Sequence, residues 1–183
     1  MIWIIILIIA VIVVAYIAIY NGLQKAKVYT DESWSQIDVQ LKRRNDLIPN
    51  LVETTKGYAK HERETFAQVV ELRNQLISVP TDQQQKKMEL SNQLSESLKS
   101  IFALAESYPD LKANQEFTKL MEELANTENK IAYSRQLFNS SAAAYNQKLL
   151  TFPSNMIAKI HGMTKVAYLE VPTEEKNAPK VSF

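Results

Sequence analysis

Two histidines set the limit on metal and acid–base chemistry in this 183-residue chain. His61-Glu62 looks like the first half of the zinc-protease helix HExxH, but Thr65 stands where the second ligand is needed. No glutamate has a histidine three residues later, which is the spacing that di-metal helical bundles use. His161 precedes Gly162 at the end of a predicted helix, where the helix dipole favours an imidazolium. We therefore predict no metal site.

Other catalytic and cofactor-binding patterns are also missing from the sequence. There is no cysteine, so there is no thiolate nucleophile and no disulfide. The chain has three glycines and lacks a phosphate-binding loop, a dinucleotide fingerprint and a G-x-S-x-G nucleophile elbow. The net charge of +1 gives no basic footprint for nucleic acid. We predict no catalytic residue, no cofactor and no nucleic-acid partner, and an enzyme of unrecognised type is the alternative.

Polar side chains recur along two predicted helices and form the candidate site. They are Asp38, Arg44, Asp46, Asn50, Glu128, Arg135, Asn139 and Asn146. If the two helices pack antiparallel, some of these side chains face each other across a bundle. Three interpretations stay open: a solvated face, a buried network that fixes helix register, and a site for a ligand or partner.

The first 20 residues carry no charge and are almost entirely apolar. Twenty helical residues span about 30 Å, which matches the hydrocarbon core of a bilayer. Trp3 lies near one end of the run, and Tyr16 and Tyr20 near the other, as in the aromatic belts of membrane helices. A cleaved signal peptide fits less well, because the run is long and no basic region precedes it. We predict a transmembrane anchor over 1–20.

The positive charges that follow the span predict its orientation. Lys25 and Lys27 come directly after the apolar run, and no basic residue precedes it. The positive-inside rule then places the C-terminal bulk in the cytoplasm of a bacterial cell, attached to the inner membrane by a single pass.

Hydrophobic periodicity predicts an all-α chain after the anchor. Apolar residues at three-, four- and seven-residue steps, with prolines at the ends, predict helices over about 23–78, 81–107, 110–150 and 153–161. Pro49 either kinks or breaks the first of these helices. Long helices joined by short turns indicate an elongated antiparallel bundle over 21–171, and the tail 172–183 has the composition of a disordered segment.

Three segments carry a family resemblance. Residues 34–62 read WSQIDVQLKRRNDLIPNLVETTKGYAKHE, residues 127–146 read TENKIAYSRQLFNSSAAAYN, and residues 149–160 read LLTFPSNMIAKI. Together with the N-terminal span and YNGL at 20–23, they closely resemble the bacterial LemA family. The chain departs from the family pattern at Asn45 and in the small residues of 140–144, where the bundle is expected to be less tightly filled.

The resemblance implies a single-pass membrane protein with a helical bundle and no established enzymatic activity. We therefore expect a membrane-anchored scaffold or adaptor that binds membrane lipid through residues 1–20 and forms homo-oligomers or binds other membrane proteins. Relatives are often encoded beside a membrane zinc protease, so an accessory role for a membrane protease or an envelope-stress system is the alternative.

Overall fold

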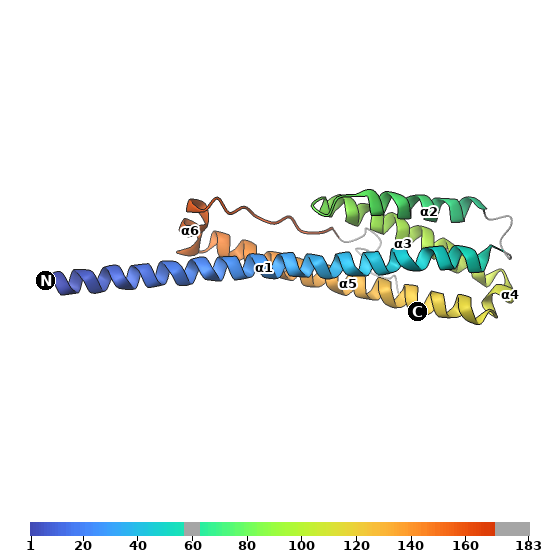
Figure 1. Ribbon diagram of the computed structural model, residues 1–183, viewed down its shortest axis with the longest axis horizontal. Helices are drawn as coiled ribbons and strands as arrows, with labels where there is room; N and C mark the ends of the chain where they lie inside the picture. The colour runs from blue at the N-terminus through green and yellow to red at the C-terminus, as the bar shows by residue number, and fades with distance from the viewer. Residues whose placement is uncertain (57–62, 171–183) are drawn as a thin grey trace, which may run out of the picture. The chain divides into compact units, whose positions relative to one another are not determined.

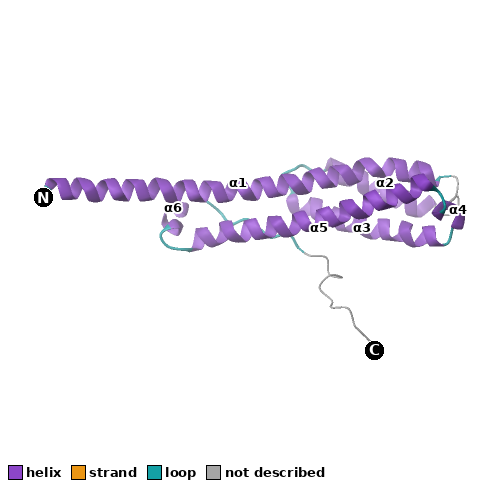
Figure 2. Cartoon of the chain, turned by 90° about the horizontal axis from the view of Figure 1, so that it is seen from below, coloured by secondary structure: helices purple, strands orange, loops and turns teal. Residues whose placement is uncertain are grey.

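The computed structural model describes residues 1–56 and 63–170. In these ranges every regular element is a helix: α1 Ile2–Thr55, α2 Arg63–Ser78, α3 Gln84–Glu106, α4 Pro109–Lys112, α5 Gln115–Leu150 and α6 Ser154–Ile160. Figure 1 shows their order, and Figure 2 shows that helices and connecting loops account for the whole described chain. The all-α prediction is confirmed. The predicted tail 172–183 lies outside the described residues.

Contacts divide the chain into two compact units. Unit 1 contains residues 1–36 and 134–168, and therefore the first part of α1, the last part of α5 and all of α6. The described residues of unit 2 are 37–56, 63–133 and 169–170, which include α2, α3 and α4. Each unit is described by itself below.

Unit 2 is a helical bundle whose successive long helices reverse direction (Figure 1). One apolar cluster fills it and draws on every helix of the unit. Its buried members include Ile48, Leu51, Val69, Leu76, Leu94, Ile101, Leu111, Phe117 and Leu124. Except for Leu51 and Leu111, these residues belong to the stripes of three- and four-residue spacing seen in the sequence, so the periodicity predicted most of this core.

Unit 1 packs α1 against the end of α5. The rings of Trp34 and Phe138 meet edge to face with their centres 6.0 Å apart, an arrangement that aromatic rings favour. Ser141 donates a hydrogen bond to the hydroxyl oxygen of Ser33, with 3.3 Å between the oxygens. Small residues at these positions let the two helices approach closely.

The predicted helix over 23–78 is wrong as a single element. The structure ends α1 at Thr55 and begins α2 at Arg63, and the two helices share one core. Their apolar residues continue one spacing pattern because both helices face the same interior, and such a pattern carries no information about chain reversal. Gly57, the residue type that commonly follows a helix, stands between them in the sequence.

Pro49 lies inside α1 and does not end the helix. Proline has no N–H, so in a helix it leaves the carbonyl four residues earlier without its usual donor. That carbonyl belongs to Asn45, and Arg73 Nε of α2 donates to it at 2.8 Å. A side chain from the neighbouring helix thus replaces the missing backbone bond.

The remaining predicted bounds need smaller corrections. The helix predicted at 81–107 begins at Gln84, and the helix predicted at 110–150 is divided into α4 and α5. Asn114 causes this division locally, because its side chain accepts a hydrogen bond from the Phe117 N–H at 3.1 Å and so caps α5. The short helix predicted at 153–161 is confirmed as α6, with Gly162 at a φ of +60° behind it.

Candidate functional site

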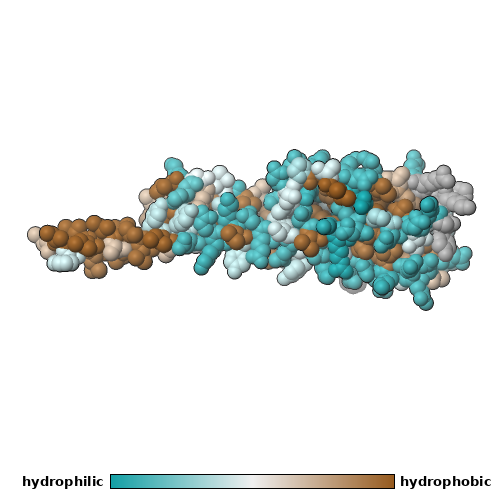
Figure 3. Space-filling view, in the orientation of Figure 1, coloured by the Kyte–Doolittle hydropathy of each residue, from teal (hydrophilic) through white to brown (hydrophobic). Residues whose placement is uncertain are grey.

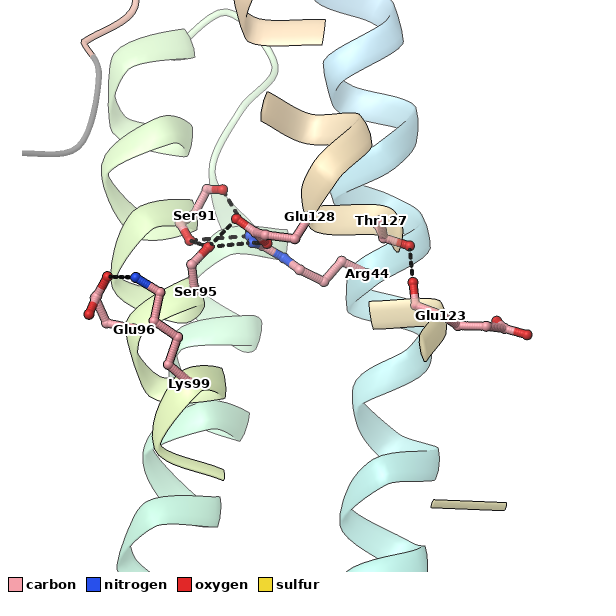
Figure 4. A network of polar contacts seen from close by, with 8 residues as sticks. All are labelled: Arg44, Ser91, Ser95, Glu96, Lys99, Glu123, Thr127 and Glu128. Carbon is pink, nitrogen blue, oxygen red and sulfur yellow. Dashed lines mark hydrogen bonds and ion pairs between the residues drawn. The ribbon is translucent and has the colours of Figure 1, made fainter. Parts of the chain in front are cut away.

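Arg44 is the centre of the polar site in unit 2. Its side chain has no exposed surface and lies among three helices (Figure 4). Nη1 donates to Glu128 Oε2 of α5 and to Ser95 Oγ of α3, both at 2.9 Å. Nη2 donates to Ser91 Oγ at 2.8 Å and to the Ser91 carbonyl at 3.3 Å. One guanidinium therefore joins α1, α3 and α5.

The electrostatics of this site favour a fixed structure. A buried guanidinium is tolerated when a carboxylate and hydrogen-bond acceptors surround it. Ser95 supports the arrangement, because it also donates to Glu128 Oε1 at 2.7 Å. The Glu128 side chain keeps 42% of its surface exposed, so one side of the ion pair meets solvent.

A second ion pair lies in the same unit, between Asp38 of α1 and Lys87 of α3. Both residues line a shallow groove of about 260 Å³. Lys42 and the exposed Asp46 line it as well, so two carboxylates and two ammonium groups balance each other there. This balance gives the groove no net charge with which to attract an ion.

Asn146 acts in unit 1, on the chain that follows α6. Its Nδ2 donates to the Val166 carbonyl at 2.8 Å, and its Oδ1 accepts from the Val166 N–H at 2.9 Å. The buried amide thus serves the extended residues near 166 as a neighbouring strand would.

Tyr145, next to Asn146, is also buried in unit 1. Burial raises the pKa of its hydroxyl above the ordinary 10.0, and the carboxylate of Asp31 raises this pKa further. Both causes disfavour the phenolate, so this hydroxyl stays protonated at physiological pH.

The other residues predicted for the site differ in their exposure. Asn50 is exposed, Arg135 is buried and Asn139 is partly buried. Of the membrane-interface residues, Trp3 is exposed near the start of α1, and Tyr16 and Tyr20 lie beside His161. Among residues 1–56 and 63–170, no three His, Asp or Glu side chains gather as a metal site would require. His61 lies outside those ranges.

Sequence reasoning missed Ser91, Ser95 and Lys87. The two serines are four residues apart, each directly after Leu90 or Leu94 of the apolar stripe of α3. A pair of hydroxyls at one helical turn beside a buried stripe is a signal for a polar partner inside a bundle. It identifies no partner by itself, because serine also occurs on solvated faces.

Comparison with known proteins decides the family. A model described as the LemA family matches residues 33–183, which is most of the chain. The chain belongs to the LemA family. The match includes Arg44, Ser91, Ser95 and Glu128, and all four residues lie in one contact network of this LemA-family chain.

Three relatives show how far the similarity extends. Protein LemA of Metamycoplasma hominis is 25% identical over 88% of this chain and 73% of its own length. The magnetosome protein MamQ of Magnetospirillum gryphiswaldense is 24% identical over 84% of this chain, which spans 63% of MamQ. The magnetosome protein MamQ 2 of Paramagnetospirillum magneticum is 24% identical over 86% of this chain and 68% of its own length.

α1 adds a physical feature that this LemA-family chain shares with membrane proteins. By length and composition it is able to cross a bilayer, and none of its most apolar stretch is buried by the rest of the protein. Isoleucine or valine is exposed at nearly every position of this stretch, which is unfavourable in water. Burying one such side chain would gain about 1.5–3 kcal/mol relative to leaving it exposed. By length, composition and exposure, this helix points to a membrane protein.

Proposed function

We propose that this LemA-family chain is a membrane-anchored, non-enzymatic scaffold or adaptor. It acts by binding copies of itself or other membrane proteins. The observation that carries the proposal is the course of α1, because its exposed apolar run continues as one helix into the packed residues of unit 1. Such a helix presents the surfaces of unit 1 directly beside the bilayer.

Two further observations support a binding role. The contacts of Arg44, Asn146 and Asp38 join helices or hold a segment within the fold, so these polar groups are accounted for without a reaction. A groove of about 640 Å³ in unit 1, half of whose lining residues are small, such as Ala26, Ser140 and Ala144, leaves room for a side chain from a partner.

For the membrane itself we propose the bacterial inner membrane, with the helical bundle on the cytoplasmic side. The support is the placement of Lys25 and Lys27 directly after the span. The chain has no cysteine, so Glu32→Cys introduces a single reactive thiol at an exposed position of α1. A membrane-impermeant maleimide should label it only after the cells are opened, and labelling in intact cells would place the bundle outside.

The scaffold role is tested by lysine crosslinking of the tagged, full-length protein in native membranes, with mass spectrometry of every band. Bands at multiples of the 20.9 kDa chain mass support self-association. A discrete band that contains another membrane protein, a protease included, supports the adaptor form. A protein that remains monomeric and uncrosslinked, while a known membrane oligomer in the same sample is crosslinked, would contradict both.

A further inference from the structure

α6 packs against the part of α1 where the apolar run ends. Tyr16 Oη lies 2.7 Å from His161 Nε2, and the ring centre of Tyr20 lies 4.5 Å from that of His161. One turn further along α1, Leu23 packs with Ile157 and Ala158 of α6. All of these residues belong to unit 1, so the position of α6 on α1 is fixed within one compact unit.

This position sets the depth of α6 if α1 spans a bilayer. Asn21 is the first strongly polar residue after the apolar run, and Lys25 is the first charged one. At 1.5 Å per residue, Tyr16 lies only about 7 Å before Asn21 and about 14 Å before Lys25. The polar region of one leaflet is about 5–8 Å thick. Side chains that contact Tyr16 and Tyr20 therefore lie at the boundary between headgroups and acyl chains.

Four large apolar side chains are exposed at the end of α5, in the loop that follows it and on α6. Ile157 and Ala158 point inward, whereas Met156 and Ile160, one helical turn apart, are exposed. Phe152 is 79% exposed, Ile160 is 71% exposed, and Leu150 is exposed as well. We call Leu150, Phe152, Met156 and Ile160 the α6 apolar face. Figure 3 shows how close the apolar surface of the N-terminal helix comes to the rest of unit 1.

The charged residues that flank the α6 apolar face in the sequence are all basic. No Asp or Glu occurs between Glu128 and Glu170, whereas Lys148, Lys159 and Lys165 lie within this stretch. Lys148 and Lys159 are exposed beside the apolar face. An apolar face with a basic border is typical of protein segments that lie in the interface of an anionic membrane.

We propose that the α6 apolar face is a second membrane contact of this protein. It inserts into the leaflet through which α1 leaves the bilayer, and Lys148 and Lys159 bind anionic headgroups. The partner of this face is a lipid surface, because the anchor helix α1 brings the face to the bilayer. This inference therefore rests on the same anchor as the proposed function.

The depth of spin labels in the full-length protein tests this contact. Single cysteines are introduced as Phe152→Cys and Ile160→Cys, with Val11→Cys in the span and Glu32→Cys on exposed α1 as matched controls. Each nitroxide-labelled variant is reconstituted in vesicles of phosphatidylcholine and phosphatidylglycerol. Collision rates are measured with oxygen, which concentrates in acyl chains, and with a water-soluble nickel complex. We expect labels at 152 and 160 to collide with nickel several-fold less than the label at 32, and to remain accessible to oxygen.

The controls separate the possible failures. In one outcome the label at 11 lies in the acyl chains, but the labels at 152 and 160 collide with nickel as often as the label at 32. The proposed lipid contact of the α6 apolar face is then wrong, whereas the transmembrane anchor is supported. If the label at 11 also meets nickel freely, the anchor itself is wrong. Labels at 152 and 160 that meet neither reagent are covered by protein, which overturns the lipid contact in favour of a second copy.

A lipid comparison tests the lysines. The labels at 152 and 160 should lie deeper in vesicles with phosphatidylglycerol than in vesicles of phosphatidylcholine alone, and Lys148→Gln with Lys159→Gln should remove the difference. Equal depth in both lipids would overturn the binding of anionic headgroups.

Discussion

Arg43 and Arg44 are neighbours with opposite surroundings. The Arg44 side chain is fully buried with four acceptor contacts, whereas the Arg43 side chain is 47% exposed and 4.0 Å from Glu123. Each buried hydrogen-bonding group that loses its partner costs about 1–3 kcal/mol, and an exposed ion pair contributes about 0–1 kcal/mol. The burial of the guanidinium therefore decides which arginine matters for stability.

We expect Arg44→Ala to lower the free energy of unfolding by about 3 kcal/mol or more, and Arg43→Ala by less than about 0.5 kcal/mol. Denaturant unfolding in detergent, followed by circular dichroism, measures both. Equal effects of the two substitutions would mean that the Arg44 network adds no stability.

Arg73 and Pro49 form a second test, because their effects should be coupled. Arg73→Met removes the donor to the Asn45 carbonyl, and we expect a loss of about 1–2 kcal/mol in the parent chain. In a Pro49→Ala background the backbone N–H of residue 49 bonds this carbonyl instead, so Arg73→Met should have a much smaller effect. A double-mutant cycle with a coupling energy near zero would contradict this account of how α1 continues through Pro49.

The raised pKa of Tyr145 predicts that the free energy of unfolding depends on pH. Its pKa is raised in the folded protein, so above pH 10 the unfolded chain loses this proton before the folded chain does. Stability from Tyr145 is therefore complete below pH 10 and falls as the pH rises, by at most about 1.4 kcal/mol per pH unit. The difference in unfolding free energy between the parent chain and Tyr145→Phe should shift in favour of Phe above pH 10, and a constant difference from pH 8 to 11 would contradict it.

The individual helices show which parts of the fold could be predicted from the sequence. The seven-residue repeat Phe117, Leu124, Ile131, Phe138 and Tyr145 predicted the buried face of α5 correctly, because one stripe packs along the whole helix. The same reasoning joined α1 to α2, since period alone does not record where a chain turns back. Arg44 and Glu128 were selected as polar candidates, but their serine partners and Lys87 required the three-dimensional packing.

Two glycines in these elements should respond in opposite directions to alanine. A Cβ at Gly22 in α1 would meet only Lys148 Nζ, at 3.9 Å, so Gly22→Ala should stabilise the helix by up to about 1 kcal/mol. Gly162 has a φ of +60°, and its N–H and that of Met163 close α6 with bonds to Lys159 and Ala158. Gly162→Ala should therefore destabilise by about 1 kcal/mol. Thermal unfolding in detergent compares them, and the same sign for both would refute this assignment.

At the scale of the whole chain, one uninterrupted helix leads from the exposed apolar run into the folded part of unit 1. α1 has 54 residues, against about 11–12 for an average helix in a globular protein. Its apolar first part is exposed, and Leu23, Thr30 and Trp34 of the same helix are buried in unit 1. An apolar helix that continues as a core helix leaves no separate linker between the exposed run and the folded part of unit 1.

Hydrogen–deuterium exchange of the full-length protein in lipid nanodiscs tests this claim most directly. Backbone amides of a continuous helix stay protected, whereas a flexible linker exchanges within seconds. We predict slow exchange from residue 6 to residue 36 without a gap, including residues 18–30, where the span meets unit 1. Fast exchange within 18–30, between two protected segments, would show a hinge in place of the continuous helix and would contradict the account.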